Sequence, residues 1–165
     1  MRRIKVLLGV SALATFALLA TVALADDKAE KIPPDKLPAK IAEAIKGRFP
    51  KAEITSAEKE KEDGKVVYDI ELKSEGKKYE MDILEDGTII EIEKEVDVNK
   101  LPEGSTKTIE EKFPKAKILE VMEVNKVEGK KETPIHYEVT IETAEKKKKE
   151  VILSLDGKSV KEEGK

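Results

Sequence analysis

Apolar and polar positions follow two different periods along this chain, and the change of period separates the elements we expect. Between residues 37 and 49 apolar side chains recur every four positions, as on one face of an α-helix; they are Leu37, Ile41, Ile45 and Phe49. Pro38 suits a first helical turn, where its missing N–H is not needed. Pro50 ends the pattern. A short helix of about eleven residues is therefore predicted, with Pro38 in its first turn and its end before Pro50.

The period then changes to two, in runs that are separated by an acidic residue and a glycine. The runs are 53–61, 66–73, 78–84 and 88–95, and the separating pairs are Asp63-Gly64, Glu75-Gly76 and Asp86-Gly87. Such pairs between alternating runs are a strong hairpin signal. One face of each run is polar, which is typical of an antiparallel sheet with one face in solvent. We expect a four-stranded meander.

The same series of patterns then occurs a second time. Lys36-Leu37-Pro38 and Phe49-Pro50-Lys51-Ala52 recur 64 positions later as Lys100-Leu101-Pro102 and Phe113-Pro114-Lys115-Ala116. A second helix is expected at 103–112, followed by strands at 118–127, 135–142, 150–155 and 158–161. Extra residues of the second unit fall at 127–133, where a longer hairpin loop costs little.

The predicted fold class is α+β, with two tandem repeats that each consist of a helix and a four-stranded antiparallel meander. We expect the sheets to lie side by side, with both helices packed on one face. A shared core would compensate for the small size of each unit, because the fraction of surface that is buried on folding rises with chain length. The first repeat is expected over 36–99 and the second over 100–165, after a flexible lead-in at 26–35.

Residues 1–25 have the layout of a cleaved signal peptide. Arg2, Arg3 and Lys5 precede an uncharged, mostly apolar stretch, and Ala23-Leu24-Ala25 forms a small-x-small cleavage site. The alternative is a retained anchor, since the uncharged run of 6–25 is just long enough to span a bilayer. The cleavage site followed by acidic residues favours cleavage, and hence a periplasmic or secreted protein without a membrane contact.

Charge and cysteine content restrict the classes of partner. The whole chain has a net charge of −3, and residues 1–25 contain three basic and no acidic residues, so residues 26–165 carry −6. This sign gives no general attraction to nucleic acid or to anionic lipid. The absence of cysteine excludes disulfides and a lipid-modified cysteine anchor.

The repeated Leu-Pro, the short helix, Phe-Pro-x-Ala-x-Ile, the Tyr-led strand and the Asp-Gly turn together resemble the PepSY-like family of secreted domains, over about residues 36–162. That family is similar to β-lactamase inhibitor proteins in its tandem layout. The resemblance implies an extracytoplasmic, non-enzymatic module that restrains a peptidase or binds another envelope protein, and it brings no catalytic residues. This chain has no Trp, and its aromatic residues alternate toward the helix side, so we do not expect β-lactamase inhibition.

No catalytic, cofactor-binding or metal-binding residues are predicted. His136 is the only histidine and is expected on a solvent-facing strand position, and no serine lies in a Gly-x-Ser-x-Gly motif. No Asp-x-Asp-x-Asp-Gly calcium loop occurs either. The four lysines at 146–149 fall in a predicted hairpin turn, without aromatic residues for stacking on bases.

Our leading hypothesis is a monomeric, non-enzymatic binding module for another envelope or secreted protein. The expected contact residues lie on the polar sheet face: Glu71, Glu80, His136, Glu138 and Glu142. The alternative is a small-ligand or divalent-cation sensor that uses the same acidic face. We expect no cofactor.

Overall fold

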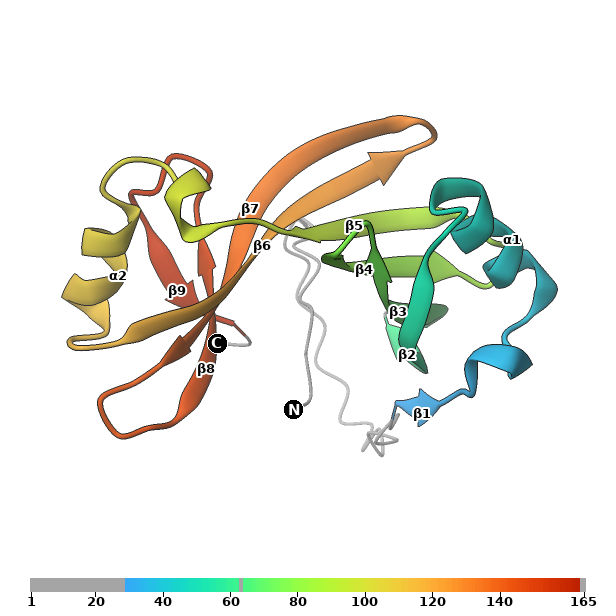
Figure 1. The fold of residues 1–165 in the computed structure, drawn as a ribbon, viewed down its shortest axis with the longest axis horizontal. Coiled ribbons are helices and arrows are strands. Elements are labelled where there is room, and N and C mark those ends of the chain that lie inside the picture. Colours follow the sequence, from blue (N-terminus) through green and yellow to red (C-terminus); the bar gives the residue numbers. More distant parts are fainter. Residues whose placement is uncertain (1–28, 63, 164–165) are drawn as a thin grey trace, which may run out of the picture.

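The computed structural model describes residues 29–62 and 64–163, and it is an α+β structure with one nine-stranded antiparallel sheet (Figure 1). The strands are β1 (Glu30–Lys31), β2 (Glu53–Glu62), β3 (Lys65–Ser74), β4 (Lys77–Leu84), β5 (Ile89–Glu95), β6 (Lys117–Glu128), β7 (Lys131–Glu142), β8 (Lys148–Leu153) and β9 (Val160–Glu162). The helices are α1 (Ala39–Arg48) and α2 (Ser105–Lys112), each preceded by a short 3-10 helix, η1 (Pro34–Lys36) or η2 (Val98–Lys100). The predicted α+β class and the antiparallel strands are confirmed.

Sequence order and spatial order are the same across the sheet, from β1 to β9. The middle of the sheet is the pairing of β5 with β6, in which Glu93 lies opposite Val124 and Glu95 opposite Met122. Because this ladder is continuous, the face that one half of the sheet presents is shared by the other half.

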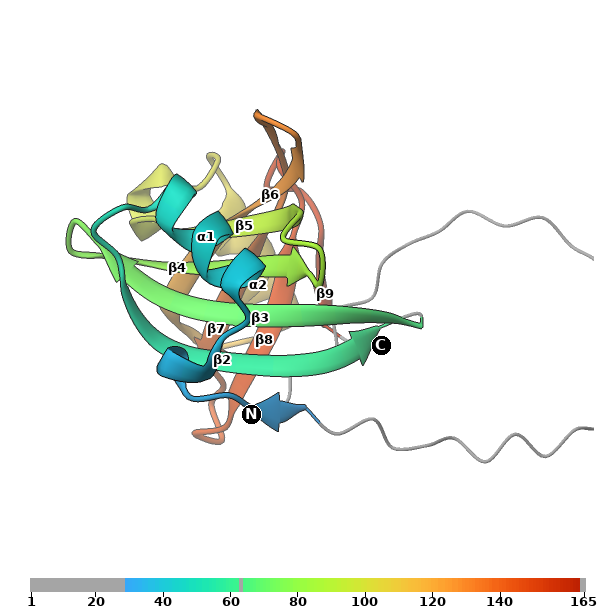
Figure 2. The same cartoon turned by 90° about the vertical axis from the view of Figure 1, so that its right-hand side faces the viewer.

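Two separate hydrophobic cores lie on the helix side of the sheet. The first core consists of Ile41, Ile45, Ala57, Tyr68, Ile70, Leu72, Met81, Ile83 and Ile92. The second core consists of Ile109, Val121, Val139, Ile141, Val151, Leu153 and Val160. The predicted helical stripe and strand alternation supply these residues, and α1 lies across the strands of the first core (Figure 2).

The expectation of one shared core is wrong, because polar residues separate the two clusters. At the β5–β6 junction Lys94 lies opposite Glu123, and Ile92 of the first core lies opposite Asn125. The Asn125 amide is buried and donates to the Glu123 backbone carbonyl at 3.2 Å. A buried amide with a hydrogen-bond partner is tolerated, but it adds no apolar contact between the cores.

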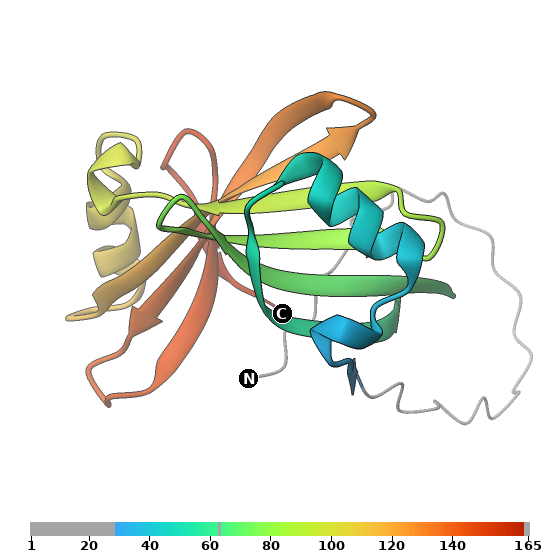
Figure 3. The ribbon, with the colours of Figure 1, turned by 45° about the vertical axis from the view of Figure 1, so that its right-hand side comes forward.

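The extra residues of the second unit lengthen two strands rather than a loop. β6 and β7 continue to the Gly129-Lys130 turn and form a hairpin that extends past the sheet toward α1 (Figure 3). Val127 packs against the first core, and Arg48 of α1 forms an ion pair with Glu132. The hairpin therefore connects the two halves a second time.

Two further observations refine the sequence expectations. The predicted signal peptide lies outside the described residues, whereas part of the expected flexible lead-in is ordered on the sheet edge. There β1 pairs with β2, and the Ile32 amide donates to the Ala57 carbonyl at 2.9 Å. Among residues 29–62 and 64–163, no helix combines the length and the apolar character that crossing a bilayer requires.

The two Asp-Gly turns pack against the start of a helix. Gly87 has φ +90° and Gly157 has φ +71°, a backbone region that favours glycine. A Cβ on Gly157 would overlap the buried Ser105 hydroxyl and stand 3.0 Å from Pro102 Cβ. The Thr108 hydroxyl also donates to the Gly157 carbonyl at 2.8 Å.

We predict that Gly157→Ala lowers the free energy of unfolding by about 2–4 kcal/mol, because overlap with α2 adds to the cost of a left-handed alanine. Gly76→Ala is the matched control, since Gly76 has φ +77° with no atom within 4 Å of the added Cβ; it should cost about 1 kcal/mol. Urea unfolding of both variants measures the difference. Equal losses would contradict the packing role of Gly157.

A pH dependence follows from the same turns. Asp86 accepts from the Thr88 amide at 2.9 Å, and Asp156 accepts from the Ser154 hydroxyl at 2.6 Å and the Lys158 amide at 3.1 Å. These bonds lower the pKa of each carboxyl below its ordinary 3.8, chiefly through the Thr88 amide for Asp86 and the Ser154 hydroxyl for Asp156. A depressed folded-state pKa stabilises the protein above the unfolded pKa, and this contribution disappears as pH falls through the folded value.

The stability advantage of the wild type over Asp86→Ser/Asp156→Ser should therefore be constant from pH 7 to about 5 and shrink between about pH 4 and 2. Thermal unfolding across this range measures it. Asp97→Ser controls for the loss of an exposed negative charge, because Asp97 makes no side-chain capping bond. An advantage that grows toward pH 2 would contradict this account.

Candidate functional site

The side of the sheet opposite the helices, called the open face below, collects most of the acidic strand residues. The alternate residues of β2–β8 that point away from both cores form it, and they include Ser56, Glu58, Glu60, Val67, Asp69, Glu71, Lys73, Lys78, Glu80, Asp82, Leu84, Glu91, Glu93, Glu95, Glu120, Met122, Val124, Lys126, His136, Glu138, Thr140, Glu142, Lys148, Glu150 and Ile152. Its first half, on β2–β5, is mainly acidic. Its second half is mixed, because the apolar side chains of Met122, Val124 and Ile152 lie between polar ones.

The strand register places like charges directly opposite one another in the first half. One row across the sheet is Glu71, Glu80 and Glu93. The next row is Glu58, Asp69, Asp82 and Glu91. Directly opposed like charges disfavour an antiparallel pair, and Lys78, 3.0 Å from Glu80 Oε1, is one cation that offsets this repulsion.

Several of these carboxylates are buried, although the sequence pattern predicted a solvated face. Glu80 is 0% exposed, Glu93 is 1% exposed and Asp82 is 5% exposed. Glu71 and Asp69 are half-buried. The expectation of a half-solvated sheet is therefore wrong at the centre of the open face. Weak hydration there strengthens every charge interaction.

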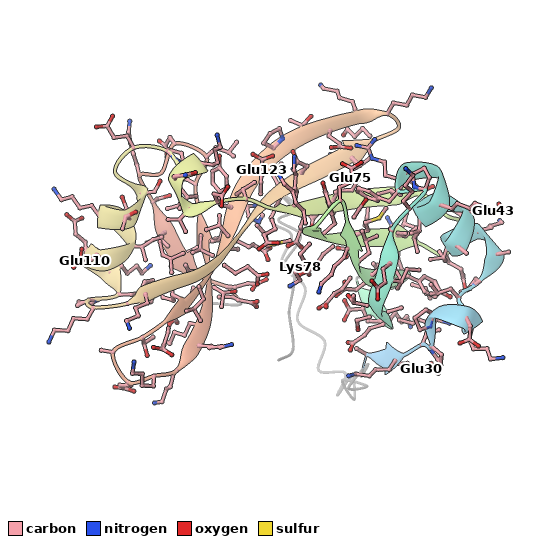
Figure 4. The ribbon with its side chains drawn as sticks, viewed as in Figure 1. Glu30, Glu43, Glu75, Lys78, Glu110 and Glu123 are labelled. Atoms are coloured by element: carbon pink, nitrogen blue, oxygen red, sulfur yellow. The ribbon has the colours of Figure 1, made fainter. Side chains whose placement is uncertain are left out.

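Lys78 provides a positive charge at the middle of the open face. Its ammonium lies 3.0 Å from Glu80 Oε1 and 3.2 Å from Glu120 Oε1. Glu80 belongs to β4 and Glu120 to β6, so Lys78 joins the two halves of the sheet, and Figure 4 places it between them. Both pairs are partly shielded from solvent, because the Lys78 side chain is 25% exposed.

His136 and Glu138 form a second polar group on the open face. His136 Nε2 lies 3.4 Å from Glu138 Oε1, at the long end of hydrogen-bond distances. Glu138 is 6% exposed, and its Oε2 atom has no hydrogen-bond partner among the described residues. A buried carboxylate oxygen without a donor is costly, so this atom can accept a hydrogen bond from a bound partner.

The structure brings together four of the five predicted contact residues as two pairs. Glu71 lies opposite Glu80, and His136 lies beside Glu138. Glu142 is at the far end of β7, where it accepts from Lys146 at 2.9 Å, and this bond lowers the pKa of the Glu142 carboxyl. Glu142 is thus occupied by a local ion pair.

Sequence reasoning missed Glu91, Glu93 and Lys78 as members of the site. Alternation in the run 88–95 places both glutamates on the polar face, and that signal was available. Their position opposite Asp82 and Glu80 depends on the hairpin register, which includes an irregularity at Asp82/Ile83 that no residue pattern indicated.

Other kinds of site find little support in the described part of the chain. A shallow depression of about 470 Å³ is lined by Lys40, Gly64, Lys65, Val66, Leu84, Glu85 and Asp86, far from the predicted contacts. Its charged lining differs from the mostly apolar walls of small-molecule pockets. Within residues 29–62 and 64–163, no group of three or more His, Asp or Glu side chains converges as a metal site would require.

Known structures share this fold. A DUF2874 family protein from Bacteroides uniformis aligns with a TM-score of 0.56 at 13% identity, covering 76% of this chain and 89% of its own. A protein described as a "putative periplasmic" protein from Bacteroides eggerthii gives 0.56 at 12% identity, with coverages of 76% and 88%. A BLIP-like protein from Bacteroides fragilis gives 0.50 at 20% identity, with coverages of 80% and 86%. No curated protein matches the chain.

At these identities the structural likeness establishes the fold alone. The family comparison goes further, because it rests on the sequence and covers both halves of the sheet. The family model described as "Putative beta-lactamase-inhibitor-like, PepSY-like" matches residues 22–91 and 67–160. The chain therefore belongs to the PepSY-like family.

Proposed function

We propose that this protein is a non-enzymatic binding module of the cell envelope, secreted or periplasmic, whose open face contacts another protein. The observation that carries the proposal is the pair of carboxylate rows at the centre of the open face. A surface on which one sign of charge is concentrated provides the electrostatic complementarity by which protein interfaces select a partner. The description of the family as beta-lactamase-inhibitor-like supports a protein ligand.

The contact residues of this proposal are Glu71, Glu80, His136 and Glu138, with Glu142 at the margin. The location rests on the predicted leader and on the periplasmic description of a structural neighbour. The same proposal includes three further statements. The protein is a monomer, and its two repeats span 36–99 and 100–165. The partner that it restrains is a peptidase.

A divalent-cation sensor is the second candidate function, and the same carboxylate rows favour it. Carboxylate oxygens are ligands that Ca²⁺ prefers, but an ion needs six to eight of them within about 2.6 Å. The rows spread their carboxylates across strands that stand about 4.8 Å apart. We therefore rank this function below protein binding; a rise in melting temperature with millimolar Ca²⁺ would reverse the order.

A site-specific crosslink tests the leading proposal. Benzoylphenylalanine at position 71, on the open face, should yield one saturable protein adduct in an envelope extract of the native host. The same residue at position 43, exposed on α1, is the matched control and should yield none (Figure 4).

The identified partner is then purified and its affinity measured against Glu71→Lys and Glu138→Gln. We expect each substitution to weaken binding about tenfold or more, since charged contacts near the centre of an interface carry much of its energy. Adducts of equal yield at positions 43 and 71, or unchanged affinity in both variants, would refute binding through the open face.

A further inference from the structure

We propose that β1 and Lys112 cap the two edges of the sheet, and that they thereby keep this chain from pairing head to tail with further copies of itself. The two edges, at β1–β2 and at β9, lie at opposite ends of the strand order (Figure 1). Each edge repeats a strand position that is joined inside the molecule, at the β5–β6 junction. The caps are separate from the open face and go beyond the proposed function.

The outer edge of β2 repeats the edge at which β6 pairs with β5. The equivalent contacts, 64 positions apart, are the ladder pairs Lys31–Glu58 and Glu95–Met122 and the backbone hydrogen bonds Ile32–Ala57 and Val96–Val121. β1 therefore occupies on β2 the place that the end of β5 occupies on β6. Because β1 has two residues and β5 has seven, positions 60–62 of β2 have no strand on their outer side among the described residues.

The outer edge of β9 repeats the edge that β5 presents to β6. The equivalent pairs, 70 positions apart, are Asp82–Glu91 and Ile152–Lys161, and Met81–Ile92 and Val151–Glu162. The Asp-Gly turns that precede the two strands are separated by the same 70 positions. β9 thus corresponds to β5, but within the described part of the chain no further strand pairs with it.

A second copy would therefore fit by a register that the molecule already uses. With the pairing of β5 and β6 as the template, β9 of one copy would lie antiparallel to β2 of the next, with Glu162 opposite Lys61. The contact joins two different edges, so it would not close into a dimer but would continue into a chain of copies. Native sheets cover edges that could pair in this way.

β1 closes the β2 side of this contact. It covers the Glu58 and Lys59 positions, and Ile32 extends the cover to Ala57. Only 60–62 remain, a stretch at the short end of strand lengths. Glu60 would also face Glu163 of the second copy, and opposed like charges disfavour pairing.

Lys112 closes the β9 side. Its ammonium donates to the Val160 carbonyl at 2.8 Å. A backbone bond joins Ser154 to Ser159, and bonded and non-bonded pairs alternate in an antiparallel ladder. The next residue, Val160, therefore points its carbonyl away from β8, toward the free edge. Lys112 occupies an acceptor that a further strand would use.

The matching residue of the first repeat makes the opposite use of this position. Arg48 stands 64 positions before Lys112, at the end of α1. It forms an ion pair with Glu132 of the β6–β7 hairpin, which belongs to the neighbouring half of the sheet. At the internal junction the cation reaches across to the next repeat, whereas at the end of the sheet it bonds to the edge of its own repeat.

Disulfide trapping between two variants of the purified protein tests the caps, because the chain has no cysteine of its own. The first variant combines Glu30→Pro/Lys31→Pro, which removes the backbone donors of β1, with Glu60→Cys. The second combines Lys112→Met with Glu163→Cys. Positions 60 and 163 would form a closely spaced non-bonded pair, which a disulfide can bridge. We expect several-fold more mixed disulfide than from the same cysteine variants with both caps intact.

Two further changes are the matched controls. Glu30→Ala/Lys31→Ala removes the same side chains as the proline pair but keeps the backbone donors. Lys107→Met removes a lysine of α2 that pairs with Glu111 at 3.8 Å rather than with the sheet edge. Neither control should raise the yield of mixed disulfide. Far-UV circular dichroism checks folding; if the proline variant is unfolded, Lys112→Met with β1 intact should still exceed Lys107→Met, because 60–62 stay open.

Sedimentation velocity on Glu30→Pro/Lys31→Pro/Lys112→Met, without added cysteines, measures the form of the assembly. We expect its mean mass to keep rising with protein concentration, while the wild type stays a monomer. Equal disulfide yields with and without the caps, or homodisulfides in excess of the mixed one, would overturn the inference. Assembly that stops at a dimer, or a wild type that assembles as readily as the variant, would overturn it as well.

Discussion

Pairing of β5 with β6 is the interaction on which the two surfaces of this molecule depend. The ladder sets Glu93 against Val124 and Lys94 against Glu123, so alternate residues of both halves emerge on common sides. Both cores and both helices therefore lie on the same side of the sheet. The other receives the carboxylate rows, which meet the mixed second half of the open face at this junction. Without that ladder the two halves would not share an open face.

The halves are joined by polar contacts more than by a common core. Asn125 and the Lys94–Glu123 pair interrupt the apolar side of the sheet, while Lys78 links β4 and β6 on the open side. The β6–β7 hairpin adds Val127 and the Arg48–Glu132 ion pair. The Arg48–Glu132 pair is exposed, and exposed ion pairs contribute little stability. The relative position of the halves therefore depends chiefly on the β-ladder, on Val127 and on the partly buried Lys78–Glu120 pair.

The sequence predicted most of the fold, because alternation and turn chemistry are local. The Leu37–Phe49 stripe, the acidic-glycine turns and the inward aromatic residues correspond to observed elements, and Tyr68 lies in the first core. Cross-strand partners depend on register and bulges, which no local pattern specifies. The opposition of Glu80 and Glu93, their burial, the polar division between the cores and the hairpin over α1 were therefore beyond sequence reasoning.

Glu80 and Glu93 lie directly opposite each other on β4 and β5, and like charges in such a position are expected to repel in the folded protein. A double-mutant cycle on Glu80→Gln and Glu93→Gln, measured by urea unfolding at pH 7 and low salt, tests it most directly, since the cycle isolates the interaction between the two side chains. We expect a repulsive coupling of about 0.2–1 kcal/mol, with the second substitution stabilising less once the first is present. A coupling of zero, or an attractive one, would contradict the account.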